Sequence, residues 1–182
     1  MVGGYKPSSL KEALEIRTKH DVVPYAGGTD LMVHADPTVT YLFLGDLDEL
    51  KTITVDEQYV RVGAAVSFTE ALHSPDIPQI MKDTVELIAA PAIRNVGTFG
   101  GNLGNGSAKA DSVLVEFAMG AKIHLASMEK ERIVDVDKFY LGHKKLDLND
   151  DELITEILLP KTGLESYYFK KVGGRSALAI PR

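Results

Sequence analysis

The chain has 182 residues, 45% of them apolar and 25% charged, which is ordinary for a globular protein of one domain or two small subdomains. Its net charge of −6 and its scattered Lys and Arg residues argue against nucleic acid as a partner, because that binding rests on clustered basic side chains. No apolar run approaches the roughly 18 residues of a membrane span, and no signal-peptide pattern is visible, so we expect a cytoplasmic protein.

The chain contains no cysteine, and this excludes several kinds of chemistry. A disulfide, a thiolate nucleophile and the usual cysteine frame of an iron–sulfur cluster are all ruled out. Redox chemistry would need an organic cofactor or a partner subunit. We also expect no metal, because the five histidines lie far apart without ligand spacing: His20, His34, His73, His124 and His143.

The first fifty residues predict a small α/β unit. Ser9 and Glu12 have the Ser-x-x-Glu spacing of a capping box at the start of a helix. The expected elements are a helix over 9–19, a strand over 21–26, a short helix over 30–34 and a strand over 40–44. This order favours parallel pairing, and we expect an N-terminal subdomain over residues 1–50.

From residue 51 the pattern changes to that of an α+β unit. A second capping box lies at Ser67 and Glu70. The expected strands are a hairpin of 52–55 and 59–62, a hairpin of 123–125 and 133–136, and single strands over 153–159 and 166–172. One helix is expected over about 76–90, where Pro91 ends or bends it. Another is expected with Asp111 at its N-cap, ahead of the apolar Val113, Leu114, Phe117 and Ala118. We expect a second subdomain over 51–164.

Two glycine-rich turns carry the chemistry. The first turn runs from Tyr25 to Leu31, and the second from Gly97 to Ser107 and on to Asp111. Glycine brings backbone N–H groups close to an anion because it lacks a Cβ and tolerates positive φ. The first turn alone could be an ordinary strand-to-helix connection. Together the two turns suggest a ligand with more than one phosphate and a further polar group, such as a sugar.

The second turn is neither a P-loop nor a Rossmann fingerprint. Gly101 and Gly106 have the outer spacing of a P-loop, but Ser107 stands where its lysine belongs. A GxGxxG motif within a βαβ unit is also missing. The turn therefore suits holding a pyrophosphate rather than transferring a phosphate.

Three charged residues near the turns have two interpretations each. Asp111 could cap a helix or accept hydrogen bonds from ribose hydroxyls, and Asp30 could cap its own short helix. Arg94 could bind a phosphate or form an ordinary surface salt bridge. The sequence leaves these alternatives open.

At these turns the chain resembles the FAD-binding (medium) subunit of the molybdenum hydroxylases, the family of xanthine dehydrogenase and carbon monoxide dehydrogenase. Ala26–Leu31 matches the family's AGGT-[DS]-L signature, and Thr98–Asn102 with Ser107 and Asp111 matches the second signature. Segments 151–160 and 168–177 also resemble the family, with order and spacing kept.

The resemblance implies an α+β, FAD-binding PCMH-type fold of two α/β subdomains, with FAD bound non-covalently in the cleft between them. It implies that the backbone amides of 25–31 and 98–102 surround the pyrophosphate, that Asp111 binds the ribose or adenine end, and that Ile154 packs beside the cofactor. Lys170 would approach the flavin or its phosphates, and Lys171 fits that position equally well. The implied cofactor-binding residues are Tyr25, Ala26, Gly27, Gly28, Thr29, Asp30, Leu31, Gly97, Thr98, Gly100, Gly101, Asn102, Asn105, Asp111, Ile154 and Lys170.

Three positions depart from the family pattern. Ala108 stands where proline is common, and Ile88 where some relatives place an aromatic ring near the flavin. The chain stops at Arg182, just where the family's smaller C-terminal domain begins. We therefore expect residues 165–182 to be the start of a truncated C-terminal domain.

The function implied by the resemblance is that of an FAD-binding electron-transfer subunit. It would accept electrons from a partner iron–sulfur subunit and pass them through FAD to an external acceptor, with molybdopterin and iron–sulfur clusters only in partner subunits. Two alternatives remain open: a stand-alone flavin reductase of the same fold, and a non-enzymatic nucleotide-binding or assembly module.

Overall fold

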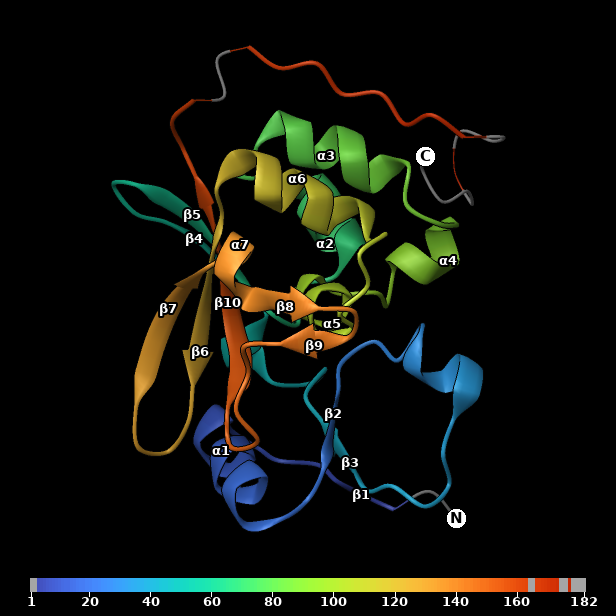
Figure 1. Cartoon of the computed structure of the whole chain (residues 1–182), viewed down its shortest axis with the longest axis vertical. Helices are drawn as coiled ribbons and strands as arrows, with labels where there is room; N and C mark the ends of the chain where they lie inside the picture. Colours follow the sequence, from blue (N-terminus) through green and yellow to red (C-terminus); the bar gives the residue numbers. More distant parts are fainter. Residues whose placement is uncertain (1–2, 164–165, 174–176, 178–182) are drawn as a thin grey trace.

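The computed structural model describes residues 3–163, 166–173 and 177, and it combines two main sheets with helices (Figure 1). The smaller sheet has the order β1-β3-β2 and is formed by β1 (Gly4–Tyr5), β3 (Tyr41–Phe43) and β2 (Val23–Tyr25). Both of its pairings are parallel, as the sequence predicted.

Helix α1 (Leu10–Lys19) lies beside this sheet and begins where the Ser-x-x-Glu spacing predicted. The Ser9 hydroxyl accepts a hydrogen bond from the amide of Glu12 at 3.2 Å. The carboxylate of Glu12 does not return to Ser9 but accepts from the amide of Ser8 at 2.7 Å, so half of the capping box forms. The predicted helix after the first glycine turn is the short 3₁₀ helix η1 (Leu31–His34).

The larger sheet is antiparallel and has the order β4-β5-β10-β6-β7. Its strands are β4 (Ile53–Val55), β5 (Tyr59–Gly63), β6 (Lys122–Ala126), β7 (Glu131–Asp135) and β10 (Leu153–Pro160). The predicted hairpins β4-β5 and β6-β7 are confirmed. Strand β10 lies between them in the centre of the sheet, which explains why its side chains are buried on both faces.

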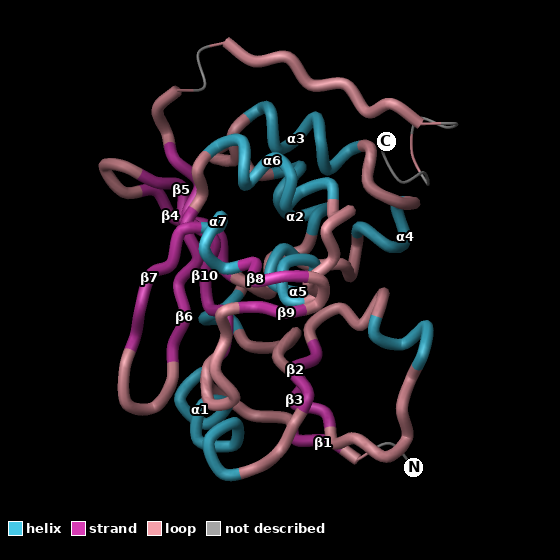
Figure 2. The backbone as a smooth tube through the Cα atoms, viewed as in Figure 1, coloured by secondary structure: helices cyan, strands magenta, loops and turns pink. Residues whose placement is uncertain are grey.

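The remaining elements join and cover this sheet (Figure 2). They are η2 (Asp48–Leu50), α2 (Phe68–His73), α3 (Gln79–Glu86), α4 (Pro91–Arg94), α5 (Phe99–Gly104), α6 (Asp111–Met119), α7 (Val136–Phe139), β8 (Tyr140–Gly142) and β9 (Lys145–Leu146). Helix α2 begins with a complete capping box, in which Ser67 and Glu70 each accept the other's amide. Helices α3 and α6 lie side by side at the top of Figure 1.

Two apolar clusters form the interior. The larger cluster fills the space between the five-stranded sheet and helices α2, α3, α5 and α6. The smaller cluster lies around α1 and β3 but also includes Ala126 and Leu153 of the five-stranded sheet. The two sheets thus share buried contacts, and the subdomain boundaries at residues 50 and 164 stay a prediction.

The structure corrects three predicted elements. The helix expected over 76–90 ends at Glu86, and Pro91 begins α4 instead of ending a helix, because proline fits the first helical turn. Asp111 is the first residue of α6, and Ala110 is its N-cap. The strand predicted over 166–172 is wrong, because the structure describes these residues without a strand. The predicted start of a C-terminal domain over 165–182 stays a prediction, and much of it lies outside the described residues.

Helix α6 also turns an unexpected face inward. It buries Val113 and Val115 together with the polar Ser112 and Glu116. Its large apolar side chains remain exposed, Leu114 to 49% and Phe117 to 39%.

Candidate functional site

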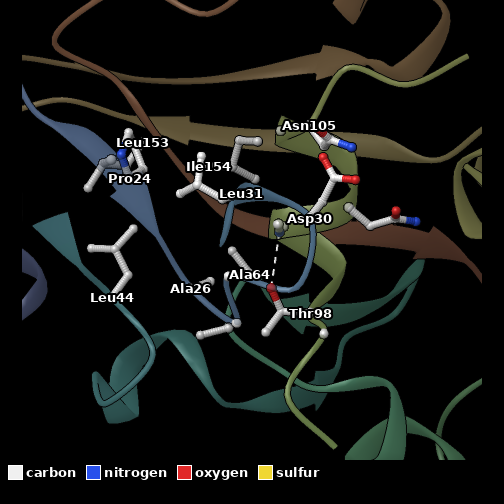
Figure 3. Close-up of a pocket in the computed structure, with 18 of the residues that line it drawn as sticks. Pro24, Ala26, Asp30, Leu31, Leu44, Ala64, Thr98, Asn105, Leu153 and Ile154 are labelled. Carbon is white, nitrogen blue, oxygen red and sulfur yellow. Dashed lines mark hydrogen bonds between the residues drawn. The ribbon is translucent and has the colours of Figure 1, made fainter. Parts of the chain in front are cut away.

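A cavity of about 450 Å³ lies where the two glycine turns meet the end of β10 (Figure 3). One side of Figure 3 shows the apolar side chains of Pro24, Leu44 and Leu153, and the other shows polar Asp30 and Asn105. The cavity therefore has a polar end beside the glycine turns and an apolar end beside the parallel sheet.

Thirteen of the sixteen predicted site residues line this cavity. They are Ala26, Gly27, Gly28, Thr29, Asp30, Leu31, Gly97, Thr98, Gly100, Gly101, Asn102, Asn105 and Ile154. The other three, Tyr25, Asp111 and Lys170, lie outside the lining.

The first turn supplies unused backbone donors. The amides of Gly27, Gly28, Thr29 and Asp30 have no hydrogen-bond partner among the described residues. Gly28 has φ +65°, and a Cβ there would lie 2.2 Å from the hydroxyl oxygen of Tyr25. A run of free amides on a left-handed bend is a backbone arrangement that binds anions.

The side chain of Tyr25 lies next to Gly28 of this turn, outside the cavity lining. Its ring packs edge-on against Tyr41 and Phe43, with centroids 5.9 and 5.1 Å away. This aromatic cluster explains why Tyr25 belongs to the pattern of the turn although it does not line the cavity. Asp30 holds the N-cap position of η1, but its side chain makes no capping hydrogen bond.

In the second turn, the first amides of helix α5 are already hydrogen-bonded within the protein. The amides of Phe99, Gly100 and Gly101 bind Val66 O, Ala64 O and the Thr98 hydroxyl at 3.2, 2.9 and 3.0 Å. The amide of Asn102 binds the Thr98 carbonyl at 2.9 Å. The first turn is therefore the better source of free amides, and the second contributes its bare α-carbons and the side chains of Thr98 and Asn102.

The two turns cross at very short range. A Cβ on Gly27 would lie 1.7 Å from the carbonyl oxygen of Val96, and a Cβ on Gly100 would lie 2.5 Å from the Cβ of Ala64. Glycine at these two positions is thus required by backbone packing. This packing fixes the distance between the walls of the cavity.

Sequence reasoning missed several residues of the lining. They include Arg17 of α1, Lys144, Glu152 and the apolar Val23, Pro24, Leu44, Leu50 and Leu153. Lys144 donates to the carbonyl and side-chain oxygens of Asn105 at 2.8 and 2.7 Å. Glu152 and Leu153 belong to segment 151–160, which resembles the family, but the others carry no local motif because the fold brings them in from distant elements.

Two charged side chains, Arg17 and Glu152, also line the cavity among the apolar side chains near the parallel sheet. Glu152 is buried and bound by Arg132 through two hydrogen bonds of 2.7 and 2.8 Å, which lower the pKa of its carboxyl group. The half-buried Arg17 donates to the carbonyl oxygen of Val22. Its buried Nε has no hydrogen-bond partner in the part of the chain that the structure describes, and burial lowers the pKa of its guanidinium group.

Asp111, Lys171 and Arg94 have structural partners elsewhere. Lys171 binds Asp111 at 2.7 Å, whereas Lys170 is exposed. Arg94 donates to the carbonyl oxygens of Ile88 and Ala89 at 2.8 and 3.1 Å, and it has no acidic partner among the described residues. The surface salt bridge that the sequence offered for Arg94 is therefore not found there.

Within the described residues, no group of three or more His, Cys, Asp or Glu side chains could hold a metal ion. No helix in this part of the chain is both long and apolar enough to cross a bilayer.

Residues 1–162 match the family model of the FAD binding domain in molybdopterin dehydrogenase. The chain belongs to this family. The FAD cofactor expected from the resemblance at the two glycine turns is thereby confirmed.

Curated relatives are named as FAD subunits or medium chains of several dehydrogenases. The nicotinate dehydrogenase FAD-subunit of Eubacterium barkeri is 30% identical over 97% of this chain and 64% of its own length. The carbon monoxide dehydrogenase medium chain of Afipia carboxidovorans is 32% identical, over 86% of this chain and 57% of its own length. Another relative, the "Putative xanthine dehydrogenase FAD-binding subunit" of Escherichia coli K12, is 33% identical over 74% of this chain and 49% of its own length.

Solved structures confirm the α+β FAD-binding fold. CO dehydrogenase from Oligotropha carboxidovorans superposes with a TM-score of 0.92 at 27% identity, covering 100% of this chain and 66% of that chain. UDP-N-acetylenolpyruvylglucosamine reductase from Thermus caldophilus has a TM-score of 0.56 at 14% identity, covering 87% of this chain and 55% of that one, a likeness of fold alone. The chain thus spans about half to two thirds of the length of the relatives named here.

Proposed function

We propose that this chain is the FAD-binding, electron-transfer part of a molybdopterin-type oxidoreductase. It would accept electrons from a partner iron–sulfur subunit and deliver them through FAD to an external acceptor. The observation that carries this proposal is the cavity itself, which places four free amides at one end and an apolar wall at the other.

The described residues fit FAD. Its pyrophosphate would lie on the amides of Gly27 to Asp30, since a doubly charged group needs several donors and backbone amides supply them without a lysine. The apolar end around Pro24, Leu44 and Leu153 would hold a flat ring of the cofactor. Ile154 lines the same cavity and would pack against the bound cofactor.

Bound FAD supplies reversible one- and two-electron redox chemistry, and the chain supplies binding and orientation. The crossing of Gly27 over Val96 fixes the two walls, so that the cofactor meets a preformed site. Thr98, Ile154 and Leu153 are themselves buried, so the parts of the wall that they form are held by packing against the interior.

The proposed partners are the subunits that would carry the iron–sulfur and molybdopterin centres. The chain has no cysteine to hold an iron–sulfur cluster. The relatives named above are described as subunits or medium chains of larger dehydrogenases. We therefore assign the iron–sulfur and molybdopterin centres to separate partner subunits.

Titration of the purified chain with FAD, FMN and riboflavin tests the cofactor assignment. Quenching of flavin fluorescence should give one site that prefers FAD over FMN by more than about tenfold, or about 1.4 kcal/mol, because only FAD has both a pyrophosphate and an adenine. Equal affinity for FMN, or no flavin binding, would contradict it.

The subunit role needs a second experiment. The chain is purified with a tag from cells that make its neighbouring gene products, and the complex is examined for iron–sulfur absorbance and electron paramagnetic resonance. Reduction of the iron–sulfur centre should be followed by bleaching of the flavin band. A chain that binds FAD yet never co-purifies with such a centre would favour the stand-alone reductase.

A further inference from the structure

Glu116 of α6 is a carboxyl group enclosed in the apolar interior. Its exposed fraction is 0%, and neither carboxyl oxygen has a hydrogen-bond partner among the described residues. Burial raises the pKa of this group to about 8. A buried polar group without a partner is costly, so its presence calls for an explanation.

Two polar side chains connect the surroundings of Glu116 to α5. Ser112 lies one helical turn before Glu116 and is fully buried, and its hydroxyl accepts a hydrogen bond from the side-chain amide of Asn102 at 2.8 Å. Tyr140 of β8 donates to the carbonyl oxygen of Leu103 at 3.0 Å. Asn102 and Leu103 are neighbours on α5, and Asn102 lines the cavity.

Both of these side chains interact electrostatically with Glu116. Ser112 opposes the rise in the pKa of Glu116, although in this conformation it is not within hydrogen-bonding geometry. The pKa of Tyr140 is raised first by burial and then by the charge of Glu116. Glu116 thus lies behind the helix that forms one wall of the cavity.

Other titratable groups near α6 do not contribute to the pKa shift of Glu116. The titratable side chains on α6 and on the elements packed against it are Asp111 on α6, Lys82, Asp83 and Glu86 on α3, Asp137 and Lys138 on α7, Tyr140 on β8, Glu156 on β10 and Lys171, which binds Asp111. None of them shifts the pKa of Glu116, which is set by burial and by Ser112. Within the described residues, Glu116 therefore has no cation that would hold it ionised.

We propose that Glu116 is a positioning residue for the cavity: in its neutral form it leaves Ser112 on α6 in contact with Asn102 on α5, and the affinity for FAD is therefore coupled to the proton on Glu116. This inference rests on the proposed function of the cavity as an FAD site. It concerns a residue outside the lining, and it assigns Glu116 no contact with the cofactor.

Ionisation of Glu116 should weaken FAD binding for two reasons. A buried carboxylate without a cation draws the Ser112 hydroxyl and water toward itself, which loosens the contact between Asn102 and α6. It also adds a negative charge behind the wall that faces the pyrophosphate. By reciprocity, FAD binding must then favour the protonated form of Glu116.

The test is the pH dependence of FAD affinity, measured by fluorescence quenching from pH 6 to 9.5. Wild-type affinity should fall by about 5- to 10-fold between pH 7 and 9.5, a common size for coupling between two sites. Glu116→Gln is always neutral and should lack this fall. The flavin ring's own titration is shared by both proteins and cancels in the comparison.

Two further variants separate positioning from general stability. Ser112→Ala keeps the buried carboxyl group but removes the contact with Asn102, so FAD should bind more weakly at every pH and with a smaller pH dependence than in the wild type. Asp137→Asn removes an exposed carboxylate on the neighbouring α7 and should follow the wild type. Near-ultraviolet circular dichroism at each pH confirms that every variant is folded.

Proton uptake gives a second readout that needs no variant. When FAD binds at pH 8 in weak buffer, the wild-type protein should take up a fraction of a proton. Parallel pH profiles for wild type and Glu116→Gln, a wild-type profile in Ser112→Ala, or absence of proton uptake would overturn the coupling. A protein that binds no FAD at any pH would instead overturn the proposed function.

Discussion

The ammonium group of Lys171 lies 2.7 Å from the carboxylate of Asp111, and the two side chains are only 2% and 14% exposed. Lys171 also donates to the carbonyl oxygen of Leu87 at 2.8 Å. Lys171 thus connects segment 166–173 both to α6 and to the C-terminal end of α3. Sequence spacing could not choose between Lys170 and Lys171, and the structure buries the second.

We predict that Lys171→Met destabilises the chain by about 3 kcal/mol, because it leaves a largely buried carboxylate without its cation. The matched control is Lys170→Met, which changes an exposed neighbour and should alter the free energy of unfolding by less than about 0.5 kcal/mol. Urea denaturation measures both values. The double variant Asp111→Asn/Lys171→Met should recover part of the loss, and equal losses for the two lysine variants would contradict the burial of Lys171.

We predict that Gly28→Ala weakens FAD binding at least about tenfold, or 1.4 kcal/mol. Gly28 has φ +65°, and the new Cβ would collide with the Tyr25 hydroxyl and displace the free amides of the turn. Gly120→Ala is the control, since Gly120 has φ +69° but open space around its Cβ position. It should carry a similar backbone strain yet bind FAD like the parent. If both variants bound FAD equally well, the first turn would not be the phosphate site.

We predict that Thr98→Val costs about 1 kcal/mol of stability, because it removes the hydroxyl that accepts the amide of Gly101 at the start of α5. FAD affinity should fall as well, since the loosened first turn of α5 lines the cavity. Thr98→Ser retains the hydroxyl and should behave like the wild type in thermal unfolding and in FAD titration. Equal loss in the serine variant would mean that the methyl group, not the cap, matters.

We predict that FAD is bound non-covalently. The chain has no cysteine, and none of its five histidines lines the cavity in the part of the chain that the structure describes. Precipitation with acid should therefore release all of the yellow colour into the supernatant. Colour that stays with the pellet would disprove the prediction.

We predict that Glu116 makes the chain less stable as the pH rises from about 5 to about 8. Its folded pKa of about 8 lies above its unfolded value of 4.5, so the folded state binds more protons in this interval and the free energy of unfolding falls. The slope approaches about 1.4 kcal/mol per pH unit as an upper limit. Glu116→Gln should flatten the slope, and the difference between the two proteins isolates this group from carboxylates such as Asp56 and Asp135, whose lowered pKa values act at acid pH.

Local patterns predicted the local elements. The capping box at Ser67 and Glu70 and the hairpins β4-β5 and β6-β7 depend on neighbouring residues, and all three are confirmed. The glycine signatures predicted nearly half of the residues that line the cavity, because close backbone approach leaves a direct mark on the sequence. Long-range contacts left no such mark.

Arg17 and Glu152 illustrate what the sequence could not predict. They reach the same cavity from α1 and from the turn before β10, and only the assembled sheets bring them together. Helix α6 is a second example. Its apolar Leu114 and Phe117 suggest one buried face, yet tertiary packing selects the face with Ser112 and Glu116.

The central position of β10 has a consequence for how the protein is made. This strand is the last of the five to be synthesised, yet it lies between β5 and β6. Until β10 is made, each hairpin therefore has one edge strand whose backbone groups are unpaired. Pairings this distant in sequence fold slowly. Because Leu153 and Ile154 belong to β10, the cofactor cavity closes last, and FAD joins a chain whose synthesis has already passed residue 160.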